Sequence, residues 1–345
     1  MRTNVVTWLP ALLFAWTSCG GPLEKKATGM MFEIVVVMEP DDWEGEVGKV
    51  IKADLLSAIP GLPQAESTMK IMYTSPGQFD GMLTYVRNIL RVTINPNQYT
   101  KVSLHAQKDV WANGQAVVQI NAPDGASIVE YVQAHERILA NYYTVMERRR
   151  LTAQLEKTYH QPLTRKIEDK FGVTVKVPTT FSACKEDGDS FFWASDNVVS
   201  GRTDLVVYTF PYESTKTFTR DYLVAKRDSV MKINMPGTFQ NSYMATETSY
   251  AEPVYKAITV NGKYCGELRG LWKMKGDMMG GPFVSHARVD EVNNRIVVVE
   301  GFVYAPETDK KNYIRRIEAA LYTLHLPGED TELPEVEILP YKNDF

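Results

Sequence analysis

Apolar runs alternate with helical patterns along the chain, which predicts a mixture of strands and helices. Residues 32–38 (FEIVVVM) are uninterruptedly apolar, as expected for a strand inside a sheet. After an acidic start at 41–44, apolar side chains recur at helical spacing until Pro60, with Asp54 as the polar exception on that face. This region therefore predicts a strand followed by an amphipathic helix.

The rest of the first half continues in the same way. Asn113 and Gly114 separate two apolar runs, and an Asn-Gly pair in that position is a strong hairpin signal. A long helical pattern runs from Asp124 to Tyr159, and Pro162 marks a break. The other elements expected are strands at 69–73, 90–94, 102–106, 110–111 and 116–120 and a short helix at 79–88.

Strand patterns predominate in the second half. The elements expected there are strands at 173–177, 190–193, 205–210, 257–260, 266–274, 283–289 and 295–304, a helix at 218–231 and a last helix with Ile314, Ile317, Leu321 and Leu324 on one face. The fold class predicted is α+β, with mixed or antiparallel sheets and helices packed on one face. A chain of this length suggests two domains, 30–161 and 162–345, divided near Pro162.

A local similarity suggests a duplicated unit. Residues 120–124 (INAPD) and 303–307 (VYAPE) each leave a strand and enter a helix through Ala-Pro-acid. One α+β unit repeated in each half would explain both. Coincidence is the alternative, because proline and an acid are common at helix starts.

The N-terminus has the features of an export signal. Arg2 precedes an apolar run at 5–16, and small residues surround Cys19. A positive start, a short apolar run and a small-residue cleavage site are typical of a signal peptide. We therefore predict a lipoprotein signal peptide at 1–18, a lipidated Cys19 and a flexible tether over 19–29. Trp16 is an exception, because a small aliphatic residue is usual three positions before the lipidated cysteine.

A lipidated cysteine would hold the protein on a membrane. Stable anchoring takes about two acyl chains, and a triacylated cysteine exceeds that number. Gly20, rather than an aspartate, follows Cys19, which favours the outer membrane. The expected location is the cell envelope, on the outer membrane and facing the periplasm, with the membrane itself as one partner.

Charge and cysteine content narrow the function classes. The formal net charge is −4, and the one basic run, residues 148–150, follows Glu147 on a helical pattern that indicates a solvated helix face. We therefore expect no nucleic-acid partner.

Cys184 and Cys265 would meet an oxidising compartment after export, where a disulfide between them is one outcome and two separate buried thiols the other.

Catalytic patterns are present only in fragments. Ser-x-x-Lys, Ser-Asp-Asn and Lys-Thr occur in the order found in penicillin-binding proteins, but Phe218 replaces the glycine that follows Lys-Thr. His135-Glu136 begins a zinc helix motif, yet Leu139 occupies the position of the second ligand. We expect no metal and no cofactor, and the sequence assigns no catalytic residue.

A glycine-rich segment at 262–286 is the strongest candidate for ligand binding. Arg269 and Lys273 could hold an anion, Trp272 could stack on a sugar or peptide, and Gly280 and Gly281 permit close backbone approach. These five residues are the candidate binding set. A twisted hairpin with glycine-rich turns explains the same pattern more simply.

Three stretches resemble a known family. FEIVVVMEPDDW at 32–43, PGLPQAE at 60–66 and LRGLWKMKGDMMGGPF at 268–283 are similar to a Bacteroidetes lipoprotein family called domain of unknown function 4837. The resemblance extends over nearly the whole chain after the signal peptide. It implies lipoprotein export and an envelope location, and it supplies no substrate, cofactor or catalytic residue.

The function expected is a non-enzymatic binding or assembly module with an envelope protein or glycan as partner. The alternative is an envelope hydrolase acting on glycan or peptidoglycan through two carboxylates. Asp41, Asp42 or Glu44 beside Trp43 could join such a site, although capping of a helix explains these acids more simply.

Overall fold

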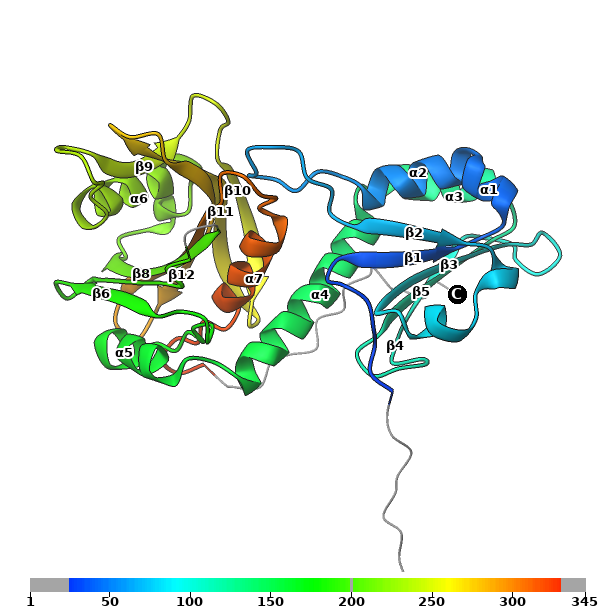
Figure 1. The fold of residues 1–345 in the computed structure, drawn as a ribbon, viewed down its shortest axis with the longest axis horizontal. Helices are drawn as coiled ribbons and strands as arrows, with labels where there is room; N and C mark the ends of the chain where they lie inside the picture. The colour runs from blue at the N-terminus through cyan, green and yellow to red at the C-terminus, as the bar shows by residue number, and fades with distance from the viewer. Residues whose placement is uncertain (1–24, 199–200, 330–345) are drawn as a thin grey trace, which may run out of the picture.

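The computed structural model describes residues 25–198 and 201–329 as two domains joined by a long helix, α4 (Ile138–Lys157) (Figure 1). The signal peptide, Cys19 and most of the tether lie outside the described residues. The α+β class and the division into two domains are confirmed. Among the described helices, none is long and apolar enough to cross a membrane.

The N-terminal domain is built on a five-stranded sheet in the order β2-β1-β3-β5-β4. Neighbouring strands run parallel except β4, which is antiparallel to β5. As predicted, β1 is buried along its whole length inside the sheet. The strands are β1 (Glu33–Val37), β2 (Lys70–Thr74), β3 (Asn88–Ile94), β4 (Ser103–Lys108) and β5 (Ala116–Ala122).

Three helices cover one face of this sheet. Ile51 of α2 (Glu46–Leu55), Ile128 of α3 (Gly125–Ala134) and Leu139 of α4 belong to one buried cluster with the strands. The opposite face carries a smaller cluster, over which Phe79, Leu83 and Trp111 pack from loops and short turns. The remaining short elements are α1 (Pro40–Glu44), η1 (Pro76–Gln78) and η2 (Gly81–Tyr85).

Two expected helices are interrupted. The helix expected from 41 onward divides into α1 and α2 at Gly45, and the long helix after Asp124 divides into α3 and α4. At the second break Arg137 adopts a left-handed conformation, with φ of 59°.

The expected hairpin is formed by β4 and β5. Its loop is longer than Asn113-Gly114 alone, and residues 110–111 do not form a strand.

Asp54 is polar on the apolar face of α2 because it caps α4. Its Oδ1 accepts a hydrogen bond from the backbone N–H of Ala140 at 2.8 Å, in the first turn of that helix. Burial raises the pKa of Asp54, and the amides at the start of α4 and Arg137 oppose that rise. The first four N–H groups of a helix lack partners within it, so this carboxylate fixes where α4 begins.

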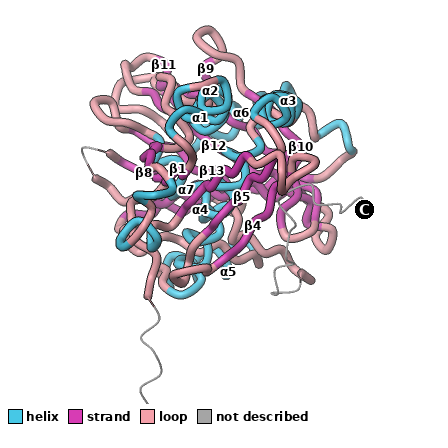
Figure 2. Tube along the Cα trace, turned by 90° about the vertical axis from the view of Figure 1, so that its right-hand side faces the viewer, coloured by secondary structure: helices cyan, strands magenta, loops and turns pink. Residues whose placement is uncertain are grey.

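The C-terminal domain is an antiparallel sheet of eight strands, in the order β10-β11-β12-β13-β8-β7-β6 with β9 paired to β11. Its strands are β6 (Ala183–Asp187), β7 (Phe191–Ser195), β8 (Arg202–Pro211), β9 (Tyr243–Glu247), β10 (Val254–Val260), β11 (Lys263–Lys275), β12 (Gly280–Asp290) and β13 (Arg295–Tyr304). Viewed along the long axis, strands fill the middle of the molecule, with α2, α3 and α5 outside them (Figure 2).

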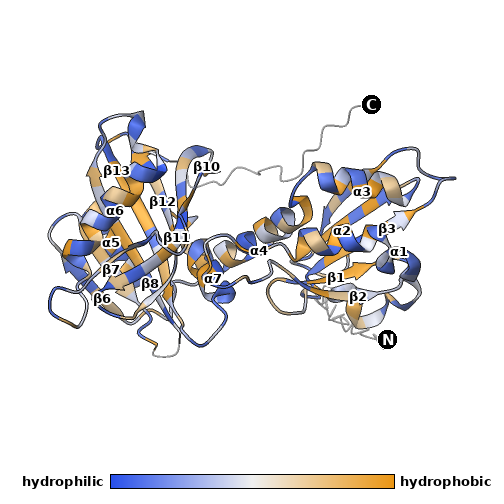
Figure 3. Cartoon of the chain, turned by 90° about the horizontal axis from the view of Figure 1, so that it is seen from above, coloured by the Kyte–Doolittle hydropathy of each residue, from blue (hydrophilic) through white to orange (hydrophobic). Residues whose placement is uncertain are grey.

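Helices cover both faces of this second sheet. Ile167 of α5 (Gln161–Phe171) and Ile317 of α7 (Lys311–Leu321) pack on one face, and Leu223 of α6 (Arg220–Asn234) packs on the other. The short turn η3 (Thr215–Thr217) precedes α6. The central strands are mostly coloured hydrophobic, whereas hydrophobic and hydrophilic residues alternate along the helices (Figure 3).

The two halves are not copies of one unit. The first sheet is mostly parallel with five strands, and the second is antiparallel with eight. The shared Ala-Pro-acid segments lead into α3 in one domain and towards α7 in the other, which reflects common helix-start chemistry.

We expect Asp54→Ala to destabilise the protein by about 1–2 kcal/mol, because it leaves the first turn of α4 without its cap. Asp54→Asn keeps an acceptor oxygen and is the matched control, with a smaller loss. Urea unfolding measures both. An equal loss in the two variants would mean that packing, rather than capping, is what Asp54 contributes.

Candidate functional site

Trp272, the aromatic member of the predicted binding set, lies inside the C-terminal domain. It is 1% exposed on β11 and packs against the ring of Phe302 with centroids 5.5 Å apart. Its Nε1–H donates to the backbone oxygen of Val303 at 3.1 Å. The indole is therefore satisfied within the core and presents no face to a ligand.

The two glycines of the set serve this packing. Gly281 lies opposite Trp272 in the β11–β12 ladder, and a Cβ at that position would come within 2.0 Å of the backbone oxygen of Val303. A Cβ on Gly280 would lie 2.9 Å from the backbone oxygen of Trp272. Close backbone approach is thus required, as the sequence indicated, but the group that approaches is another strand.

The two cations of the set are engaged on the protein itself. Arg269 is buried and forms ion pairs with Glu267 at 2.8 Å and Glu318 at 2.5 Å. Lys273 pairs with Glu247 at 2.9 Å, and this bond is the main reason that the pKa of Glu247 falls to about 2. Arg269 faces α7 while Trp272 belongs to the cluster under α6, so the sheet separates them. The structure therefore corrects the binding-set prediction.

The two cysteines are separate free thiols. Cys184 is exposed on β6 and Cys265 is buried on β11. Four strands lie between β6 and β11 in the sheet order, and adjacent strands are about 4.8 Å apart. A disulfide needs Cα atoms within about 7 Å, so of the two outcomes left open the structure shows separate thiols, of which only Cys265 is buried.

A buried group of charges lies where the two domains meet, and sequence reasoning missed it. Glu318 on α7 is paired with Arg269 on β11 and, at 3.0 Å, with Arg315 one turn earlier on α7. Arg148 of α4 approaches the same carboxylate at 4.0 Å and lies over the ring of Tyr322 at 3.8 Å. We call these residues, with Glu267, the junction cluster.

The arginines keep the Glu318 carboxylate ionised inside the protein. Burial alone would raise its pKa, but the charges of Arg269 and Arg315 outweigh burial and bring the pKa to about 2. Glu267 behaves in the same way, since Arg269 and His286 overcome the effect of burial and hold its pKa well below the usual value. The cluster is thus a compensated set of buried ions rather than a site with an available acid or base.

The PGLPQAE segment makes a second contact between the domains. Glu66 accepts hydrogen bonds from the backbone N–H groups of Lys310 and Lys311 at 2.8 and 2.9 Å. These amides open α7, so a carboxylate from one domain caps a helix of the other. Lys311 Nζ donates in turn to the backbone oxygen of Ser67 at 2.9 Å.

Beside these contacts is a cleft of about 420 Å³, which we call the junction cleft. Its apolar lining includes Leu151 and Leu155 from α4, Phe181 and Ile317. Pockets for small ligands are typically 300–1,000 Å³ and are often found between domains. The junction cleft has a volume in this range and lies between the domains, so we take it as a candidate site.

Polar groups surround the apolar floor of the cleft. Arg316 and Gln154 are exposed at the rim, as are hydroxyls of Thr158, Thr179 and Thr180. Asp196 also lines the cleft, but its Oδ1 accepts from the backbone N–H groups of Val198 and Thr203, so it shapes the loop. The arrangement can bind an apolar group and orient it by a few hydrogen bonds.

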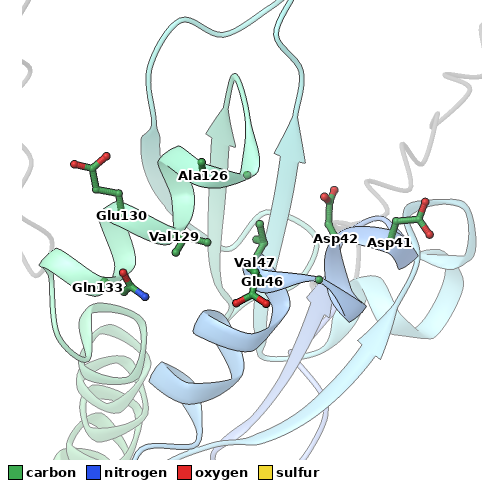
Figure 4. A pocket seen from close by; sticks show the side chains of 10 residues that line it. Asp41, Asp42, Glu46, Val47, Ala126, Val129, Glu130 and Gln133 are labelled. Carbon is green, nitrogen blue, oxygen red and sulfur yellow. The ribbon is translucent and has the colours of Figure 1, made fainter.

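A second, acidic hollow of about 560 Å³ lies between α1, α2 and α3. Burial and the neighbouring Asp41 raise the pKa of Asp42. Figure 4 shows the carboxylates of Asp41, Asp42 and Glu130 pointing in different directions around Val47 and Val129. Hydrolysis of a glycoside needs two carboxylates that converge on one bond, and these do not.

Metal ligands are also dispersed in the described residues. They contain no group of three or more His, Cys, Asp or Glu side chains that could hold a metal ion.

We expect Trp272→Ala to destabilise the protein by about 3–5 kcal/mol, the usual cost of emptying a large aromatic site in a core. Thermal unfolding measures the loss. Lys273→Ala on the same strand is the matched control, because its partly exposed ion pair contributes about 0–1 kcal/mol. If the Trp272→Ala protein is as stable as the control, Trp272 does not contribute to the core and the binding-set prediction would stand again.

Comparison with known families and structures gives the following matches. Residues 160–323 match the model described as Domain of unknown function (DUF4837), and residues 27–156 match Domain of unknown function (DUF8532). The family resemblance in the sequence is confirmed for the C-terminal part, while its motifs at 32–43 and 60–66 lie within the second match. No curated protein matches the chain.

Two solved structures match distantly. The Ran-binding protein Mog1p of Saccharomyces cerevisiae is 12% identical, with 45% of this chain and 92% of that chain covered and a TM-score of 0.29. A mutant of Mog1 gives 12% identity, 46% and 92% coverage and a TM-score of 0.27. The match to the model described as domain of unknown function DUF4837 covers residues 160–323, which make up most of the C-terminal domain.

Proposed function

We propose that this protein is a lipid-anchored binding module of the cell envelope that receives an apolar segment of a partner protein in the junction cleft. The observation that carries the proposal is the cleft itself, which lies between two domains and has an apolar floor and a polar rim. Such a lining binds a protruding apolar side chain and aligns the backbone beside it.

The cleft favours a protein segment over a glycan. Leu151 and Leu155 offer partly exposed apolar surface, whereas a sugar presents hydroxyl groups that require many paired hydrogen bonds. Arg316 at the rim supplies a charge that suits a carboxylate on the partner. Contacts between the domains on either side, including Glu66 with α7, hold the cleft open before a partner arrives.

The anchor and the cleft together suggest assembly at a membrane. A lipid on Cys19 would lie six residues before Lys25, the first described residue, and six residues span at most about 20 Å. The N-terminal domain would therefore stay close to the membrane, on the outer membrane and facing the periplasm. The partner expected is another envelope protein.

A photo-crosslinking residue in place of Gln154, at the rim of the cleft, tests this proposal in intact cells. We expect it to capture one envelope protein in a defined complex. Asp169, exposed on α5, is the control position, and a crosslinker there should capture little. Leu155→Asp should abolish capture from position 154, because a charge on the floor opposes burial of an apolar group.

Equal capture from both positions, or capture that survives Leu155→Asp, would contradict the proposal. Glycan or peptidoglycan fragments recovered with the purified protein in place of a protein partner would also contradict it and favour the hydrolase alternative.

A further inference from the structure

Three large apolar side chains project from one end of the C-terminal domain. Met278 is 101% exposed, Ile233 is 74% exposed and Phe239 is 61% exposed. They come from the β11–β12 turn, the end of α6 and the loop between α6 and β9. We call these three residues the apolar tip.

Backbone pairing brings the three segments together. Tyr243 at the start of β9 pairs with Lys275 at the end of β11, so the preceding loop extends past the end of the sheet (Figure 1). The N–H of Gly237 donates to the oxygen of Ser242 at 2.8 Å, which closes that loop. A Cβ on Gly276 would lie 3.3 Å from the Cβ of Ser242, so the loop and the β11–β12 turn are in contact.

Lysines surround the apolar tip. Lys232 and Lys275 lie on the ring of Tyr243, with Nζ 5.1 and 5.5 Å from its centroid. Lys185 reaches the end of α6, where its Nζ donates to the backbone oxygen of Asn234 at 3.4 Å. Asp277 is the acid in the turn, and its carboxylate accepts from the N–H of Met278 at 2.6 Å. Lys232 and Lys275 thus place two positive charges beside the tip, although the whole chain is acidic.

We infer that the apolar tip docks on an anionic lipid surface. Its side chains project outward and line neither the junction cleft nor the acidic hollow, so a soft surface suits them better than a shaped protein groove. Apolar side chains enter the boundary between headgroups and acyl chains while lysines beside them remain with lipid phosphates. A tyrosine between two lysines is typical of that boundary.

This contact would act together with the proposed lipid anchor. The anchor precedes the N-terminal domain, and the tip belongs to the C-terminal domain. Two attachment points on different domains would fix how the molecule lies and which way the junction cleft faces. The inference does not depend on what the cleft binds.

Vesicle flotation tests the inference with residues 20–345, which lack Cys19 and therefore carry no lipid. We expect it to float with vesicles of phosphatidylcholine containing 30% phosphatidylglycerol and to remain unbound with phosphatidylcholine alone. Met278→Ser with Phe239→Ser should lower binding at least tenfold. Lys232→Gln with Lys275→Gln should do the same, and raised salt should weaken binding of the unaltered chain.

Met82→Ser is the matched control, because Met82 is 86% exposed but lies in the N-terminal domain. It should bind as the unaltered chain does. Thermal unfolding of all variants confirms that these surface changes leave the fold intact. Absence of binding to anionic vesicles would overturn the inference, as would equal effects of the Met82 and Met278 changes. Self-association that is lost in Phe239→Ser, without vesicle binding, would instead identify the tip as an interface between copies of the chain.

Discussion

The carboxylate of Glu318 is the point on which the relation between the two domains depends. It is buried on α7 and contacts Arg269 of the C-terminal sheet, Arg315 of its own helix and Arg148 of α4. Buried ions are costly to remove from water, and they are tolerated only when their partners stay in place. Separation of α4 from α7 would take Arg148 away from the Glu318 carboxylate and from the ring of Tyr322. The charges therefore specify one arrangement of the domains more than they add stability.

That arrangement positions the proposed binding surfaces. Because α4 begins at the Asp54 cap in the first domain and ends against the second, it carries Leu151 and Leu155 to the wall of the junction cleft. Glu66 holds the start of α7, which supplies the opposite wall through Ile317. A cleft built on helices fixed at both ends is largely formed before binding, which reduces the entropy cost of association. The apolar tip lies on the same fixed body.

The sequence predicted the parts of the structure that local patterns determine. The apolar run of β1, the strands β11 to β13 and the helices α6 and α7 agree with their periodicity. The helix α5 was missed because Pro162, taken as a break, lies within its first turn. For the glycine-rich set the sequence left a binding site and a hairpin open, because it cannot distinguish a backbone that approaches a ligand from one that approaches Val303. The structure shows the hairpin of β11 and β12. The role of Glu318 could not be predicted, because its contacts with β11 and α4 are remote in sequence. The role of Asp54 had a sequence signal, because it is a polar residue on an apolar helix face.

Calorimetric unfolding of Glu318→Gln tests the central claim most directly. The unaltered protein should unfold in one transition at pH 7, and the variant in two, because the domains lose their coupling. Glu300→Gln, which breaks the buried pair with Arg227 inside one domain, is the control and should keep a single, lowered transition. Since the pKa of Glu318 is about 2 against an ordinary 4.5, its contribution is complete above about pH 4.5 and is lost as the pH falls towards 2. A single transition for Glu318→Gln, lowered only as much as that of Glu300→Gln, would contradict the account.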